Sequence, residues 1–221
     1  MKFQTSLRLP RSLALVAGTV AGLACGTASA QVQFTGFTNG CFGAGCTPES
    51  GAAPATDVLA GSGLTYANST FNVMSAGGVA GLGATGMLLP ANNIDNLGSW
   101  TLSGAPFVYD GSSFTLRVSF TAPPGTTPSS QLFTSTLIGT VNSTDNGGLS
   151  IDFNNTPVNF TFAAGAFTLR VDDVSLTPHA ELTPVSSTGF ITVTAIPEPE
   201  TYALFLAGLG AVGFMARRRK S

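Results

Sequence analysis

Short segments with a strict apolar–polar alternation constrain the fold most. In FTLRVSF, residues 114–120, every second residue is apolar, and LSIDF (149–153) and VNFTF (158–162) repeat the pattern. In FITVTAI (190–196), Ile191 and Val193 alternate in the same way, although Phe190 and Ile196 blur the pattern. A period of two places the apolar side chains on one face of a β-strand, so these segments predict half-buried antiparallel strands.

Turn-forming sequences separate these strands, with no helical pattern between them. They are Asp110-Gly111, Pro123-Pro124-Gly125, Asp145-Asn146-Gly147-Gly148 and Asn154-Asn155-Thr156-Pro157. Such spacing predicts an all-β fold, an antiparallel β-sandwich or a jelly-roll-like domain over residues 31–195. Residues 31–99 are harder to interpret: QVQFTGF, LTY and TFNVM are candidates for strands, and SAGGVAGLGATG is a candidate for a long loop.

Residues 1–30 have the three parts of a secretory signal peptide. Lys2, Arg8 and Arg11 form a cationic start, LALVAGTVAGLA is the apolar stretch, and Ala28 and Ala30 form a small-residue cleavage site before Gln31. We therefore expect export by the general secretion machinery and removal of the segment by signal peptidase.

The body of the chain is acidic. Between residues 31 and 196 only Arg117 and Arg170 are basic, against nine acids, which gives a net charge of −7. Binding to nucleic acid needs clustered cations that displace counterions, so we expect no nucleic-acid partner.

Two cysteines remain after the signal peptide, Cys41 and Cys46, in the sequence CFGAGC. In an oxidising compartment, two nearby thiols in a glycine-rich loop most simply form a disulfide, and this is our prediction. A metal site is disfavoured because His179 is the only histidine in the chain and two thiolates need further ligands.

The pentapeptide FTLRV occurs twice, at 114–118 and 167–171, through a duplicated half-sandwich or through convergence of two similar strands. After the second copy, the alternation of apolar residues shifts by one position at Asp172-Asp173, so the apolar residues before and after the pair would face opposite sides of a regular strand. A β-bulge there would return both groups of apolar residues to one face. Paired acids at a bulge could ligate calcium. The alternative is a pair of solvated acids at a strand edge.

No sequence motif indicates an active site. The body has one histidine and no lysine, and a Gly-x-Ser-x-Gly sequence is absent. The glycine-rich segment 81–86 lacks the strand–helix context of a nucleotide site. We expect a protein that is not an enzyme and has no cofactor.

The C-terminal segment predicts a short transmembrane helix. Residues 202–216 carry no charge, and Arg217, Arg218, Arg219 and Lys220 follow directly. As a helix, fifteen residues span about 22 Å, short of a hydrocarbon core of about 30 Å. The four cations would hold that end in the cytoplasm and leave the body outside.

Residues 197–221 resemble the PEP-CTERM sorting signal of Gram-negative bacterial proteins. Its three parts stand in order: Pro197-Glu198-Pro199, the apolar run with its glycines, and the arginine cluster. The resemblance implies recognition by an exosortase, cleavage near the Pro-Glu-Pro motif after transient residence in the inner membrane, and delivery to the surface of bacteria that make exopolysaccharide and biofilm. We therefore divide the chain into a signal peptide (1–30), an exported β domain (31–195) and a sorting signal (196–221).

The leading interpretation is a non-enzymatic surface or extracellular-matrix protein, associated with exopolysaccharide or biofilm. One alternative is a secreted protein that binds or hydrolyses glycans, which would need aromatic platforms; Trp100, Tyr66 and Tyr109 are the large polar-edged aromatics of the body. The other is a permanently anchored inner-membrane protein whose C-terminal segment is never removed.

Overall fold

The computed structural model describes residues 31–52, 55–83, 95–194 and 199–218. Within these ranges the chain forms fifteen β-strands and one α-helix. The predicted signal peptide over residues 1–30, with its cleavage residues Ala28 and Ala30, lies outside the described residues.

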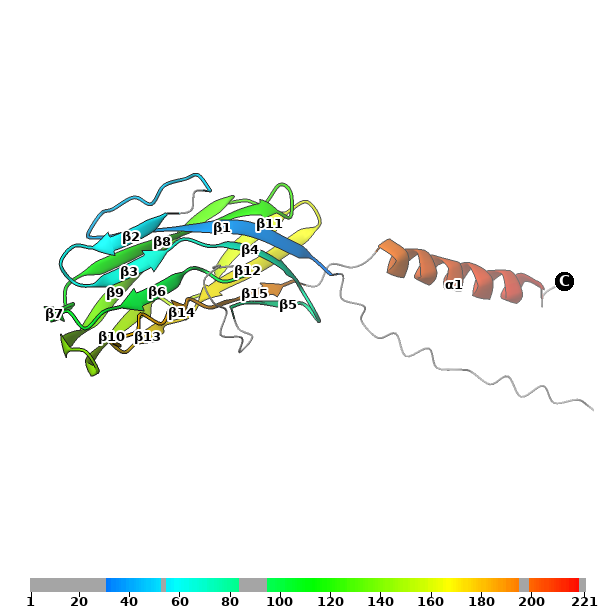
Figure 1. Cartoon of the computed structure of the whole chain (residues 1–221). Coiled ribbons are helices and arrows are strands. Elements are labelled where there is room, and N and C mark those ends of the chain that lie inside the picture. The colour runs from blue at the N-terminus through cyan, green and yellow to red at the C-terminus, as the bar shows by residue number, and fades with distance from the viewer. Residues whose placement is uncertain (1–30, 53–54, 84–94, 195–198, 219–221) are drawn as a thin grey trace, which may run out of the picture.

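Seven strands form the largest sheet, in which every pairing is antiparallel. They are β1 (Gln33–Phe42), β4 (Thr70–Met74), β7 (Phe107–Val108), β8 (Ser113–Ala122), β9 (Ser130–Ser143), β10 (Asn146–Phe153) and β13 (Val174–Leu176). We call this the seven-stranded sheet. Its strand order is β13-β10-β9-β8-β1-β4, and β7 pairs with β9 (Figure 1).

Two four-stranded antiparallel sheets complete the domain. The β12 sheet has the order β11 (Val158–Phe162), β12 (Gly165–Val171), β15 (Gly189–Val193) and β5 (Val79–Leu82). The β6 sheet has the order β14 (Val185–Ser186), β6 (Ser99–Leu102), β3 (Leu64–Ala67) and β2 (Thr56–Leu59).

Aromatic rings join the seven-stranded sheet to both smaller sheets. Phe34 of β1 packs edge-on against Phe167 of β12, with ring centroids 4.9 Å apart. Tyr66 of β3 and Trp100 of β6 contact Phe114 of β8, at centroid separations of 4.8 and 4.5 Å. All five side chains are fully buried, so the three sheets share one hydrophobic core. Burying one such ring contributes about 1.5–3 kcal/mol to the free energy of unfolding.

The predicted all-β, antiparallel fold is confirmed. In β8 the residues Phe114, Leu116 and Val118 are buried as the period of two required, and β10 buries Leu149 and Ile151 in the same way. The prediction that β8 is only half-buried is wrong, because Thr115 and Ser119 on its other face are buried as well. The finer assignment to a sandwich or jelly roll stays a prediction.

The uncertain first third is also built of strands. QVQFTGF, LTY and TFNVM lie in β1, β3 and β4 respectively. The expectation of a long loop in SAGGVAGLGATG is wrong for residues 79–82, which form β5 and pair with β15. Residues 84–94 lie outside the described residues.

The bulge expected at Asp172-Asp173 is a change of sheet instead. β12 ends at Val171 in the β12 sheet, and β13 begins at Val174 in the seven-stranded sheet, paired with β10. Val171, Val174 and Leu176 are all buried because the chain crosses between two sheets that face the same core. The shift in the alternation of apolar residues is therefore caused by the change of sheet and not by a bulge.

Two glycines of β1 let aromatic rings pack directly on the strand. A Cβ at Gly40 would lie 2.4 Å from the Phe114 ring and 2.5 Å from the Tyr66 ring. A Cβ at Gly36 would lie 2.4 Å from the Phe71 ring. Only glycine allows these approaches, and the rings bury the backbone that glycine leaves uncovered.

Candidate functional site

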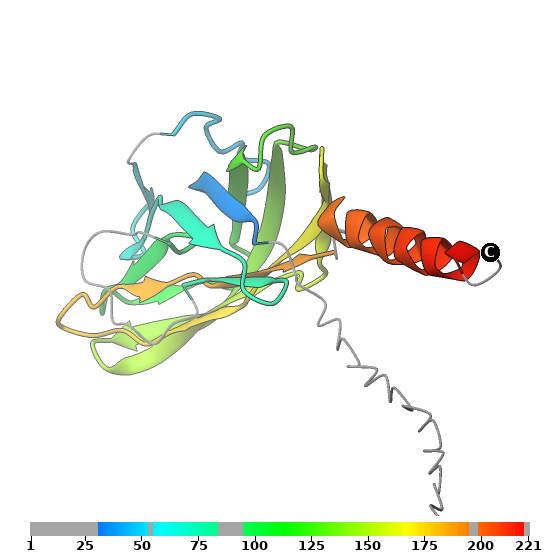
Figure 2. The same ribbon diagram turned by 90° about the vertical axis from the view of Figure 1, so that its right-hand side faces the viewer.

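The C-terminal helix α1 (Pro199–Arg218) lies apart from the β domain. It projects away from the sheets in both views (Figures 1 and 2). Five of its large apolar side chains are 55–66% exposed: Phe205, Leu206, Leu209, Val212 and Met215. The helix predicted over residues 202–216 is present, and it carries an apolar surface that the core does not use.

The described residues contain no helix that is both long and apolar enough to cross a membrane. The predicted transmembrane helix over 202–216 is therefore not confirmed. Three of its positions, Gly208, Gly210 and Gly213, add no apolar side chain, and the helix reaches charged residues at both ends, Glu200 and Arg217.

The sorting residues lie at the two ends of α1. Pro199 is its first residue, a position that suits proline because the fixed φ fits the first turn and the missing N–H needs no partner there. Arg217 is exposed and Arg218 is the last helical residue. Pro197, Glu198, Arg219 and Lys220 lie outside the described residues.

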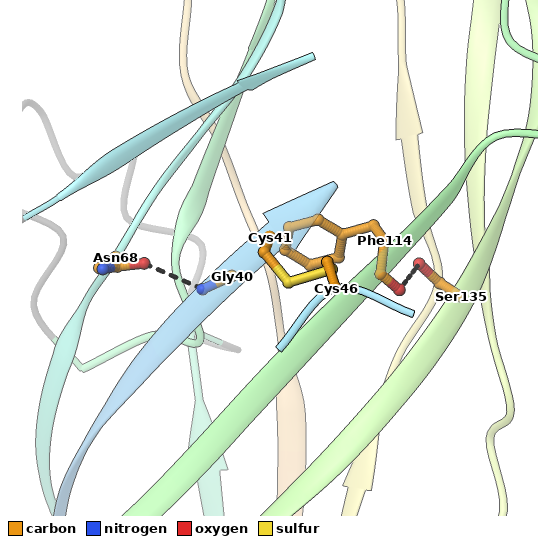
Figure 3. Close-up of a disulfide and its surroundings, with 6 residues drawn as sticks. All are labelled: Gly40, Cys41, Cys46, Asn68, Phe114 and Ser135. Atoms are coloured by element: carbon orange, nitrogen blue, oxygen red, sulfur yellow. Dashed lines mark hydrogen bonds between the residues drawn. A yellow bond between two sulfur atoms is a disulfide. The ribbon is translucent and has the colours of Figure 1, made fainter. Parts of the chain in front are cut away.

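The predicted disulfide between Cys41 and Cys46 is confirmed (Figure 3). Cys41 lies near the end of β1, opposite Thr115 of β8. The turn between the cysteines begins at Gly43, whose N–H donates to Ser113 O at 2.9 Å and whose φ is +102°. The disulfide therefore closes the turn that follows β1 at the edge of the aromatic core around Phe114.

The two aspartates at the sheet change bind neighbouring protein groups. Asp172 forms an ion pair with Arg170 at 3.0 Å and accepts a hydrogen bond from the Thr188 hydroxyl at 3.1 Å. Asp173 accepts the Phe153 N–H at 2.9 Å and the Asn155 amide at 3.0 Å. These contacts hold the crossing between the sheets, and calcium binding at the pair stays a prediction. In the ranges that the structure describes, no three His, Cys, Asp or Glu residues come together as a metal site.

His179 is exposed and links two surface segments. Its Nδ1 lies 3.0 Å from Asp145 Oδ1, in the turn between β9 and β10, and its Nε2 lies 2.8 Å from the Thr177 hydroxyl. The Asp145 N–H also donates to Pro178 O at 3.0 Å. The cluster holds the β9–β10 turn against the segment that follows β13.

The three aromatics that the sequence offered for a glycan platform are inside the core. Trp100, Tyr66 and Tyr109 are fully buried, and each donates a hydrogen bond inside the protein. Trp100 Nε1 donates to Ser187 Oγ at 2.6 Å, and the Tyr66 and Tyr109 hydroxyls donate to Leu97 O and Ser62 O, both at 2.7 Å. Burial raises the pKa of the Tyr66 hydroxyl far above its ordinary value of 10.0 and raises the pKa of Tyr109 in the same direction.

Phe190 is the surface aromatic that sequence reasoning did not select. It points outward from β15, between Gly81 of β5 and Arg170 of β12 in the cross-strand register. In the sequence, Phe190 was visible as an irregularity, because it is an apolar residue at a position where the alternation of the strand expects a polar one. The guanidinium of Arg170 lies 5.4 Å from the centroid of its ring.

These features define an all-β domain with one disulfide, followed by a separate C-terminal helix with an exposed apolar surface. Residues 195–220 match the family model described as the PEP-CTERM protein-sorting motif. The chain therefore carries a PEP-CTERM sorting signal, which indicates an exosortase-targeted protein that is exported and sorted to the cell surface in Gram-negative bacteria. The match covers the C-terminal segment, and the β domain lies outside it. No curated protein and no solved structure matched the chain.

Proposed function

We propose that this protein is a non-enzymatic component of the cell surface or extracellular matrix, whose β domain, a β-sandwich, is released to its site of action by an exosortase. The observation that carries the proposal is the sorting motif on a helix that stands apart from the core. Because the described side chains of α1 are exposed, its removal takes no buried surface away from the β domain.

The processing order follows from the arrangement of the segments. Signal peptidase removes residues 1–30, the C-terminal segment holds the precursor transiently at the inner membrane, and cleavage near Pro197 then separates the β domain. An uncharged run of only fifteen residues, 202–216, that contains three glycines and ends at arginines suits a temporary membrane residence better than a permanent one.

The surface of the β domain suits contact with exopolysaccharide or packing within a biofilm matrix. The body is acidic and rich in hydroxyl groups; the outward positions of β9, for example, include exposed Thr134 and Thr136. Hydroxyl and carboxylate groups exchange hydrogen bonds with sugars readily, whereas a net charge of −7 disfavours association with nucleic acid or with anionic lipid.

The sorting proposal is tested by the mass of the mature protein recovered from the cell surface. The expected form begins at Gln31 and ends near Pro197. Replacement of Pro197-Glu198-Pro199 by three alanines should leave the precursor at the membrane, and replacement of Glu181 and Leu182, both exposed, by alanines is the matched control. Surface protein that retains residues 202–221 would support the permanently anchored alternative and overturn the proposal.

A further inference from the structure

Among the described strands, Phe190 is the most exposed aromatic side chain, at 36%. About a third of its side chain faces solvent, so part of the ring can contact a ligand. The outward neighbours of Phe190 on the β12 sheet indicate which kind of ligand this surface suits.

A side chain stands in register with Phe190 on one neighbouring strand, and none stands in register on the other. On β12, Arg170 stands in register with Phe190, and its guanidinium lies over the ring at 5.4 Å from the centroid. On β5 the partner in register is Gly81, which has no side chain, and the exposed Val79 lies diagonally across from Phe190, opposite Thr192. The cation–π contact covers the ring on its β12 side, and no side chain stands in register with the ring on its β5 side.

Polar groups surround the ring at fixed positions. Arg170 Nη2 is paired with Asp172 Oδ1 at 3.0 Å, and the Thr188 hydroxyl donates to Asp172 Oδ2 at 3.1 Å. A guanidinium carries five N–H donors, so one ion pair leaves donors for a ligand. Thr192, two residues after Phe190, is exposed on the same face of the strand. These groups lie on or beside paired strands, which hold them more rigidly than loops would.

We propose that the outward face of the β12 sheet around Phe190 binds a neutral polysaccharide built of pyranose sugars. One face of a pyranose ring presents C–H groups that pack on an aromatic ring, while the hydroxyls at its edge pair with arginine, carboxylate and threonine groups. This proposal rests on the proposed function and names the partner that the surface protein contacts.

Charge selects a neutral polymer over an acidic one. Asp172 neutralises Arg170 locally, and the body around it has a net charge of −7. A polyuronate would meet repulsion from this field, whereas a neutral glycan would not.

The test is affinity electrophoresis of the full-length chain in mild detergent through gels that contain a neutral polymer, either a mixed-linkage glucan or a galactomannan, or a polyuronate. We expect retardation by a neutral polymer and none by the polyuronate. Phe190→Ala should weaken the retardation about tenfold, the change that about 1.4 kcal/mol of lost stacking produces. Phe190→Trp should retain it, because the larger ring keeps the platform.

Ile138→Ala is the matched control, because Ile138 is 48% exposed on β9 of the seven-stranded sheet, away from Phe190. Its retardation should equal that of the unmodified chain. If thermal unfolding shows that Phe190→Ala destabilises the fold, Phe190→Leu removes the ring face while keeping an apolar side chain, and the same loss is expected.

Three results would overturn the proposal: no retardation by either neutral polymer, retardation that Phe190→Ala and Phe190→Leu leave unchanged, or preference for the polyuronate. A concentration-dependent dimer that Phe190→Ala abolishes would also overturn it, since a second copy of the chain would then be the occupant. A failure of sorting appears separately, as a retained C-terminal segment in the mass of the surface protein, with glycan retardation unaffected.

Discussion

The indole N–H of Trp100 donates to the hydroxyl oxygen of Ser187 at 2.6 Å, deep in the core, where both side chains are fully buried. The bond joins β6 to the short segment between β14 and β15. It therefore fixes the start of the segment that leads from the β6 sheet to the β12 sheet, through a polar contact inside a cluster of aromatic rings.

Ser187→Ala should lower the free energy of unfolding by about 1–3 kcal/mol, because it leaves the Trp100 N–H buried without an acceptor. Urea unfolding followed by tryptophan fluorescence measures the change, since Trp100 is the only tryptophan in the chain. Ser186→Ala, at a half-buried neighbouring position, is the control and should change stability by a smaller amount. Equal effects of the two substitutions would contradict this account.

Gly40→Ala should destabilise the domain strongly, by about 2–4 kcal/mol, because the new Cβ would lie 2.4 Å from the Phe114 ring and 2.5 Å from the Tyr66 ring. Gly51→Ala is the matched control, since a Cβ there meets nothing within 4 Å. The midpoint of thermal unfolding, read by circular dichroism, separates the two. A Gly40→Ala variant as stable as Gly51→Ala would show that the rings move aside at no cost.

Removal of the disulfide by Cys41→Ser together with Cys46→Ser should cost about 2 kcal/mol, the loop-entropy value for so short a ring. The β8 pairing should survive, because Gly43 N–H still donates to Ser113 O at 2.9 Å. Denaturant unfolding with and without reductant gives the number. In the double serine variant, reductant should have no further effect.

The domain should unfold in alkali as its two buried tyrosines ionise. Burial raises the pKa of Tyr66 and of Tyr109 above the unfolded value of 10.0, so above pH 10 the folded state holds protons that the unfolded chain releases. Stability is thus fully present below pH 10 and falls as pH rises beyond it. In a Tyr202→Phe background, which removes the one tyrosine outside the β domain, absorbance at 295 nm reports ionisation of Tyr66 and Tyr109 and should rise together with the loss of the circular dichroism signal.

Tyr109→Phe tests the same linkage by removing one of the two groups. Relative to its own stability at pH 8, the variant should lose less stability between pH 10 and pH 12 than the unmodified chain. If absorbance at 295 nm shows that both buried tyrosines ionise before the domain unfolds, the result contradicts their assigned burial.

The sequence predicted those parts of the fold that local patterns encode. Alternation located β8 and β10 because a strand at the surface of a core must turn every second side chain inward. Cys41 and Cys46 were predictable as a disulfide because four intervening residues, two of them glycines, bring the thiols together. The sorting signal was predictable because its three parts are contiguous in the chain.

Other features depend on contacts between distant segments, which periodicity does not report. At Asp172-Asp173, a bulge within one strand and a crossing between two sheets would shift the alternation of apolar residues in the same way, so the pattern does not distinguish them. The burial of Tyr66 and Trp100 depends on Gly40 and Phe114, which pack across sheets. Phe190 was visible as an irregularity, but its meaning needed Gly81 and Arg170 on the neighbouring strands.

The position of β15 has a mechanical consequence for a protein that is tethered or released at its C-terminal end. β15 is the last strand before the sorting segment, and it lies inside its sheet, hydrogen-bonded to β12 on one side and β5 on the other. A pull on the chain after Thr194 acts along this strand, so the ladder bonds on both sides are loaded together in shear and do not open one at a time. The strand from which the C-terminal segment leaves is therefore held by hydrogen bonds on both sides, and the domain resists force at that point.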